Sequence, residues 1–211
     1  MNFIKSTFAA AAFAAVVAPA SAAVVLDFEG VGNLANIDNF YNGGTDSLGN
    51  SGMNYGIAFS SVTLGIIDSD AGGNGDFANE PSASTVMFYQ DANNAVLNAA
   101  AGFNTGFSFY YSSSTAATVN VWSALNATGT LLGSLNLLSQ YNGNQCVGDP
   151  TGAYCNWTAV GFSGTAMSID FGDTAALTVF DDITFGSVTP GVPEPETYAL
   201  MLAGLGIVGY M

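Results

Sequence analysis

The sequence predicts an all-β domain, an antiparallel two-sheet β-sandwich of jelly-roll type. Short runs of apolar, β-branched and aromatic residues recur between turn residues, and none of these runs has a convincing helical period. Glycine accounts for 26 of the 211 residues, which is typical of a chain with many tight turns. The length suits one domain of ordinary size with appendages at its ends.

The first expected strand is the segment 24–30 (VVLDFEG), in which Leu26 and Phe28 alternate with Asp27 and Glu29. Eight further strand-like segments follow it, at residues 55–67, 84–90, 105–113, 117–125, 129–138, 157–163, 165–172 and 177–186. The longest irregular stretches are 68–84 and 141–156. Loops of this length often carry function, so both are candidate functional regions.

The two ends of the chain differ from the predicted sandwich, which we place at residues 23–187. Residues 1–22 are typical of a helical signal peptide, because Lys5 precedes an apolar run and Ala20 and Ala22 offer small residues for cleavage. Residues 188–197 read as a linker, and 198–211 as a short apolar helix. That helix of fourteen residues would be about 21 Å long, which is shorter than the roughly 30 Å hydrocarbon core of a bilayer.

The charge balance narrows the possible functions. The chain has sixteen Asp and Glu, one Lys or Arg and no His, and removal of the signal peptide would remove Lys5, the one basic residue. Phosphate, nucleic acid and anionic lipid are bound through Lys and Arg, so we expect no nucleic-acid partner. Side-chain bases for Ser-His-Asp, Cys-His and Schiff-base chemistry are absent as well. Carboxylate chemistry, cation binding and binding of neutral ligands remain.

Two cysteines, Cys146 and Cys155, flank the sequence VGDPTGAY in the second long loop. In an exported chain, cysteines this close across a turn region favour a disulfide. A metal site or a catalytic cysteine would lack partners, because the sequence has no His and no further Cys.

The C-terminal residues are Val192-Pro193-Glu194-Pro195-Glu196, followed by an apolar run from Tyr198. This tail resembles the PEP-CTERM sorting signal of exopolysaccharide-producing Gram-negative bacteria. Similar tails continue a few residues further and end in a cluster of Arg, which is not present before Met211. The resemblance implies export, transient contact of the tail with the inner membrane and processing by an exosortase-type enzyme near Pro193, Glu194 and Pro195. It places the protein in the cell envelope, at the outer surface or in the extracellular matrix.

The expected first and last strands share an acidic pattern, LDFEG and FDDITFG. This pairing resembles jelly-roll carbohydrate-binding modules, in which such acids hold a structural calcium. The resemblance implies that Glu29, Asp181 and Asp182 bind calcium. Adjacent carboxylates without a base also favour a hard cation, although Glu29 and Asp182 facing solvent is the alternative.

The first long loop offers a second, weaker candidate for a cation site. Its sequence, DSDAGGNGDFANE, places Asp68, Asp70 and Asp76 among glycines, somewhat as in an EF-hand loop. A solvated glycine-rich loop is the simpler interpretation.

A sugar ligand would need exposed aromatic rings beside amide groups. If Phe107, Phe109 and Tyr111 face the core, Tyr110 faces outward, and the same alternation turns Asn120 and Trp122 outward. We therefore expect Tyr110, Asn120 and Trp122 to share one ligand-binding surface. The alternative is that these aromatics pack under a loop. For Trp157 we expect a role as a lid over the core edge.

These observations predict a non-enzymatic exported protein, associated with the envelope or with exopolysaccharide, whose sandwich is structural or binds a glycan. The alternative is a glycoside-active enzyme that uses a pair of carboxylates, since that chemistry requires only Asp and Glu.

Overall fold

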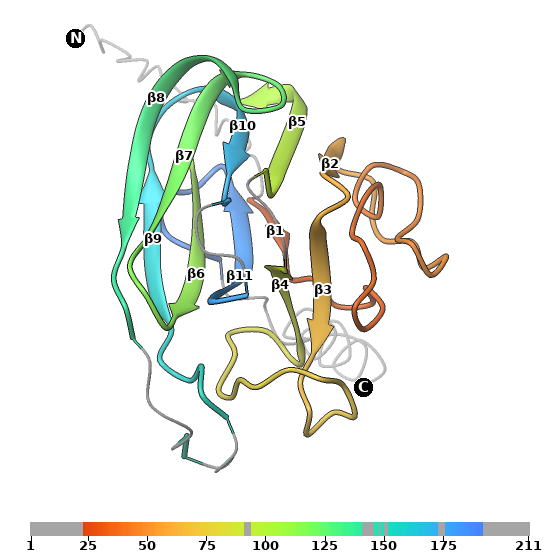
Figure 1. The fold of residues 1–211 in the computed structure, drawn as a ribbon. Coiled ribbons are helices and arrows are strands. Elements are labelled where there is room, and N and C mark those ends of the chain that lie inside the picture. Colours follow the sequence, from red (N-terminus) through yellow and green to blue (C-terminus); the bar gives the residue numbers. More distant parts are fainter. Residues whose placement is uncertain are drawn as a thin grey trace, which may run out of the picture.

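The computed structural model describes residues 23–90, 94–140, 146–147, 149, 152–172 and 176–191. This part of the chain forms two antiparallel sheets that pack face to face, and it contains no helix (Figure 1). The predicted all-β sandwich is therefore confirmed. The expected signal peptide and apolar tail lie outside the described residues.

The first sheet has six strands. Five follow the order β3-β4-β11-β6-β9, and β1 pairs with β11 beside this path. Their bounds are β1 (Val24–Leu26), β3 (Thr63–Ile67), β4 (Thr85–Tyr89), β6 (Phe107–Ser113), β9 (Thr158–Phe162) and β11 (Thr178–Phe185).

The second sheet has five strands in the order β2-β5-β10-β7-β8. Their bounds are β2 (Ile57–Phe59), β5 (Val96–Phe103), β7 (Ala117–Ala124), β8 (Thr128–Leu137) and β10 (Ala166–Asp170). From β4 to β11 successive strands alternate between the two sheets, apart from the β7–β8 hairpin. The strands β4-β11-β6-β9 thus face β5-β10-β7-β8, which is the strand order of a jelly roll.

The main core lies between the sheets and follows the period of two that a strand imposes. In β6, Phe107, Phe109 and Tyr111 are buried in it, and Val119 and Val121 of β7 meet them from the other sheet. Aromatic rings fill much of this layer at edge and tilted angles, which is favourable ring geometry. The alternation expected for these two strands is confirmed.

A second apolar cluster lies on the outer face of the six-stranded sheet. Phe77 and Trp157 cover Val86, Phe88 and Val179 there. The indole N–H of Trp157 donates to the carbonyl oxygen of Ala78 at 3.0 Å. The two long loops therefore fold back over this sheet, and Trp157 acts as a lid on this cluster and not on the edge of the main core.

The disulfide between Cys146 and Cys155 is confirmed, with a Cα–Cα distance of 5.7 Å. The disulfide lies within the second long loop, and backbone hydrogen bonds join that loop to the first. The backbone N–H groups of Ala153 and Tyr154 both donate to the carbonyl oxygen of Asp76, at 3.0 and 3.1 Å. The loops thus form one joined surface.

Three strand predictions differ from the structure. The segment 55–67 is divided, since β2 and β3 belong to different sheets and the chain turns between them. The first strand ends at Leu26, because Phe28 has a φ of 60° and turns its ring into the core. Strand β5 was not predicted, because its sequence VLNAAAGF is rich in residues with low strand propensity. Its position between β2 and β10 makes it a strand.

Candidate functional site: an acidic bulge in the last strand

Four carboxylates gather where β1 ends beside an irregular part of β11. The register of β11 against β6 shifts between Asp181 and Thr184, and Asp182 has a φ of 48°. Because Leu26 of β1 pairs with Ile183, the residues after Leu26 lie next to this irregularity. We call Asp27, Glu29, Asp181 and Asp182 the acidic bulge. Asp181 and Asp182 are fully buried.

Two of the four carboxylates accept hydrogen bonds from residues 82–85, which lead into the start of β4. The side chain of Asp181 accepts from the backbone N–H and the hydroxyl of Ser82, each at 2.8 Å. Glu29 accepts from the backbone N–H groups of Ser84 and Thr85, at 2.8 and 2.7 Å. Burial and then repulsion by Asp182 raise the pKa of Asp181 well above its usual range. These two acids therefore attach residues 82–85 to the end of β1 and to β11.

Asp182 differs from its neighbours in the acidic bulge. Both of its carboxylate oxygens are buried and have no hydrogen-bond partner among the described residues. Burial, followed by repulsion from Asp27 and Glu29, raises the pKa of Asp182 to about 7. A buried carboxylate is stable when it is protonated or when a cation offsets its charge. Asp182 is thus the side chain in the bulge with unused acceptor oxygens.

Asp27 is the residue of the acidic bulge that the sequence did not single out. Burial raises the pKa of its carboxyl group, while the N–H of Glu29 donates to its Oδ1 at 3.2 Å and opposes that rise. The pairing of β1 with β11 would have located it, since Asp27 follows the residue opposite Ile183. That pairing is long-range and cannot be read from local sequence.

The structure places Glu29, Asp181 and Asp182 in one region but does not arrange them as a ligand set. Among the described residues, no group of three or more His, Cys, Asp or Glu side chains is placed to hold a metal ion. Glu29 and Asp181 accept backbone N–H groups instead. A cation at this point would be held chiefly by Asp182, with Asp27 beside it.

The loop with Asp68, Asp70 and Asp76 is closed by its own hydrogen bonds. The carbonyl oxygen of Asp68 accepts from the N–H groups of Ala71 and Gly73, at 3.1 and 2.8 Å. These two hydrogen bonds close a tight turn over residues 68–73. Burial raises the pKa of both Asp68 and Asp76, with added repulsion from Asp70 and Asp149 at Asp68 and from Asp149 at Asp76.

The predicted sugar surface is divided between the two sheets. Tyr110 lies on β6 of the six-stranded sheet, opposite Asp181, whereas Asn120 and Trp122 lie on β7 of the other sheet. The prediction that Tyr110 and Trp122 share an outer surface is wrong, because the chain crosses from one sheet to the other between β6 and β7. The outer faces of the two sheets point in opposite directions.

Asn120 and Trp122 do share a face with two residues of β8. Asn120 pairs with Ser134 and Trp122 pairs with Leu131, and the hydroxyl of Ser134 donates to Oδ1 of Asn120 at 2.7 Å. We call Asn120, Trp122, Leu131 and Ser134 the Trp122 patch. Trp122 is half-buried, with its indole nitrogen covered.

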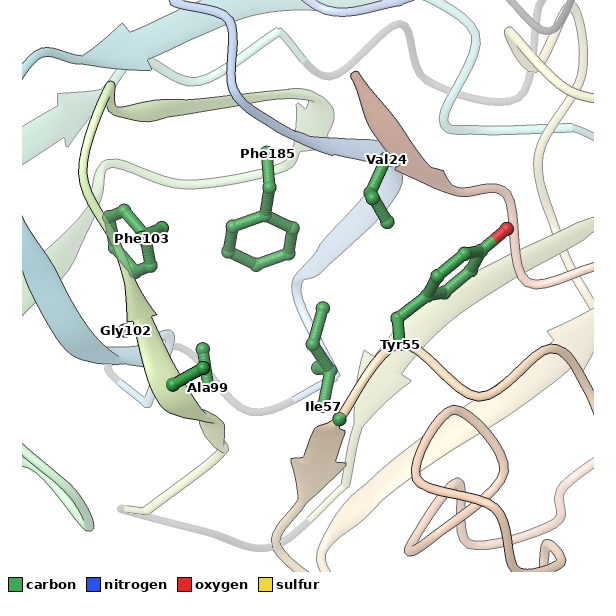
Figure 2. A pocket seen from close by; sticks show the side chains of 9 residues that line it. Val24, Tyr55, Ile57, Ala99, Gly102, Phe103 and Phe185 are labelled. Atoms are coloured by element: carbon green, nitrogen blue, oxygen red, sulfur yellow. The ribbon is translucent and has the colours of Figure 1, made fainter. Parts of the chain in front are cut away.

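An apolar hollow of about 150 Å³ lies between the sheets, where β1 and β2 leave a corner open. Figure 2 shows Val24 and Phe185 of one sheet, Ile57 and Phe103 of the other, and Tyr55 at the side with its hydroxyl group pointing away from the hollow. In the part of the chain that the structure describes, no carboxylate lines this hollow. It offers apolar surface without a catalytic group.

Comparison with known proteins identifies the end of the chain. Residues 191–211 match the family described as the PEP-CTERM protein-sorting motif. The motif implies export to the cell envelope or extracellular space and processing by an exosortase-type enzyme. No curated protein and no solved structure matches the chain significantly. In the described ranges no helix has the length and apolar character needed to cross a membrane.

Proposed function

We propose that this chain is a non-enzymatic protein of the envelope or the extracellular matrix, delivered by exosortase-type sorting, whose sandwich is structural or binds a neutral glycan. The observation that carries the proposal is the sorting motif at residues 191–211, joined to a jelly roll whose last described residue is Gly191. The sandwich would then be the part that remains after processing.

Processing is tested by expressing the full chain in matched hosts with and without an exosortase-type enzyme. Mass spectrometry is expected to find a chain that ends near Pro195 in the first host and an uncut tail in the second. Replacing Pro193, Glu194 and Pro195 together by Ala should block the cut, whereas replacing Ser187 by Ala should not. Equal chain lengths in both hosts would contradict exosortase-type sorting.

Glycan binding is supported by the distribution of charge. No charged residue occurs between Asp91 and Asp149, the part of the chain that forms β5, β6, β7 and β8. The Trp122 patch therefore combines an aromatic ring and an amide on two strands without charged residues, and Asp170 of β10, which pairs with Asn120, adds one carboxylate beside it. Neutral sugar rings stack their C–H faces on aromatic side chains, and their hydroxyls suit the amide of Asn120. An anionic glycan would be repelled by the acidic remainder of the molecule.

Trp122→Ala is expected to reduce binding to a neutral polysaccharide at least about tenfold, since a stacked ring is commonly a dominant contact. Tyr110→Ala is the matched control, because Tyr110 is an aromatic residue of the opposite outer face and should leave binding unchanged. A polysaccharide pull-down or a glycan array with folded variants measures both. An equal loss of binding in the two variants, or no loss of binding in Trp122→Ala, would mean that the Trp122 patch is a structural part of the sandwich and not a glycan-binding surface.

A structural calcium ion at the acidic bulge is part of this proposal. The support is Asp182, a fully buried carboxylate with two unused oxygens and other carboxylates nearby. Calcium prefers carboxylate and carbonyl oxygens, and it tolerates irregular coordination. Asp182 and Asp27 would hold the ion, which would offset the repulsion among the four acids.

A carboxylate pair for glycoside hydrolysis has less support. Such an enzyme needs one acid on each side of a cleft that admits the sugar. Of the acids in the bulge with raised pKa values, Asp181 and Asp182 are buried and Asp27 is half-buried, and the residues of the open hollow are apolar. A non-catalytic role therefore agrees better with the positions of the acids.

A further inference from the structure

The segment after the last strand folds back onto the sandwich. Gly186 turns the chain at a φ of 88°, and residues 187–191 then cross the outer face of the six-stranded sheet. The hydroxyl of Ser108 in β6 donates to the carbonyl oxygen of Ser187 at 3.0 Å. The N–H of Gly191 donates to the hydroxyl oxygen of Thr184 in β11 at 2.8 Å. Two strands thus bind the two ends of this segment.

Close backbone packing supports the same contact. A Cβ atom on Gly161 of β9 would lie 2.1 Å from the carbonyl oxygen of Val188, so the segment lies directly on this glycine. A Cβ on Gly191 would lie 2.8 Å from Cγ2 of Val25. The hydroxyl of Thr184 is itself fixed, because it donates to the carbonyl oxygen of Asp182 at 3.0 Å. Gly191 is therefore held in place and does not act as a free hinge.

The fixed segment and the sorting motif meet at one residue. The family match begins at Gly191, which is also the residue that Thr184 binds. Only Val192 separates it from Pro193, so Pro193 can stand at most about 7 Å from the anchored glycine. A processing enzyme must place the motif in its own active site, and the folded sandwich would obstruct it at this distance. With residues 187–191 released, the seven residues from Ser187 to Pro193 span up to about 23 Å.

We propose that residues 187–191 form a latch that holds Gly191, the first residue of the sorting motif, against the sandwich, and that Ser108 and Thr184 are positioning residues that slow processing of the motif until the latch opens. This inference rests on the proposed function, because it concerns the same exosortase-type reaction. Ser108 and Thr184 act on the reaction through the segment that they bind.

The test compares processing rates of the full chain in a host with an exosortase-type enzyme. Thr184→Val removes the hydroxyl that binds Gly191 and should speed processing about fivefold, the factor expected when one ordinary hydrogen bond is lost from the closed state. Thr184→Ser keeps a hydroxyl and should restore the slow rate. Ser108→Ala should also speed processing. Thr63→Val is the matched control, since Thr63 is a buried strand threonine that donates to Ser60.

A longer linker distinguishes two causes of faster processing, release of the latch and general destabilisation of the sandwich. Inserting Gly-Ser-Gly-Ser between Gly191 and Val192 gives the motif reach without disturbing the latch, so the inserted chain should be cut rapidly. In the chain with the longer linker, Thr184→Val should not increase the processing rate further. Hydrogen exchange of the Gly191 amide reports latch opening directly, and it should be faster in Thr184→Val than in Thr63→Val.

The outcomes distinguish the two proposals. In Thr184→Val the Gly191 amide could exchange faster while the chain is cut at the original rate. That result would overturn the latch proposal and leave exosortase-type sorting intact. If Thr63→Val accelerates processing as much as Thr184→Val does, stability and not the latch controls the rate, and the latch is again overturned. If no variant is cut, including the one with the longer linker, both proposals fail.

Discussion

Asp182→Asn is expected to stabilise the sandwich at pH 8 in the presence of a chelator, by about 2 to 4 kcal/mol. In the native chain, burial and repulsion from Asp27 and Glu29 raise the pKa of Asp182 to about 7. A carboxyl group whose folded pKa is raised favours folding when it is protonated. Its stabilising effect is complete below its unfolded pKa of about 4 and is lost as the pH rises through about 7. Asparagine removes the charge and keeps the shape.

The pH dependence is the sharper measurement. Without calcium, the free energy of unfolding of the native chain should fall between pH 4 and pH 7, by up to about 1.4 kcal/mol per pH unit for this one group. The raised pKa values of Asp27 and Asp181 act in the same direction. Asp182→Asn should flatten much of this slope, so its advantage at pH 8 should disappear near pH 4. Denaturant unfolding at several pH values measures both chains.

Calcium should reverse the ranking of the two chains. It should raise the melting temperature of the native chain above that in sodium chloride of matched ionic strength, and it should have little effect on Asp182→Asn. Equal melting in calcium and in sodium chloride would contradict the proposed ion while leaving the pH prediction intact.

Asp46→Asn is the control variant, and its expected change in stability at pH 8 is opposite in sign to that of Asp182→Asn. Asp46 is also buried, and burial by itself would raise its pKa, but hydrogen bonds from Gly32, Asn50 and Leu48 outweigh that and lower the pKa. Its stabilising effect is present above a pH of about 4 and is lost as the pH falls below its folded pKa. Asp46→Asn should therefore destabilise the sandwich at pH 8. If Asp182→Asn also destabilises the sandwich at pH 8, the carboxylate of Asp182 must have a stabilising partner in the native fold, and the inference that it is unpaired is wrong.

The local sequence pattern was sufficient to predict most strands of this fold. It was not sufficient to predict where the acidic side chains lie. Strand β6 could be predicted because Phe107 and Phe109 alternate with small and polar residues, and the disulfide because Cys146 and Cys155 have no other partner. Strand β5 was missed because tertiary pairing overrides the weak strand propensity of its alanines and glycine.

The candidate sites depended on which strands are neighbours, and that information is long-range. Asp27 and Asp182 come together because β1 pairs with β11 across the whole length of the domain. Tyr110 and Trp122 separate because successive strands of a jelly roll cross between sheets. A hairpin between β6 and β7 would have placed them on one face. The unpartnered oxygens of Asp182 arise from a bulge, and no residue pattern announced it.

Phe109→Ala should have the largest effect on stability of the substitutions considered, with a loss of about 3 to 5 kcal/mol. The Phe109 ring is fully buried and contacts the rings of Phe171 and Phe180, with centroid distances of 5.7 and 5.6 Å. Those two rings come from segments that follow β10 and lie within β11, so Phe109 joins parts of the chain far apart in sequence. A cavity there cannot close without moving both sheets.

Tyr110→Ala provides the internal comparison, since the next residue in the same strand points to the other side. Tyr110 is half-buried on the outer face, opposite Asp181, and its removal should cost about 1 kcal/mol. Guanidinium unfolding of both variants and of the native chain measures the difference. Similar losses in the two variants would contradict the alternation of β6, and with it the assignment of Tyr110 and Trp122 to opposite faces.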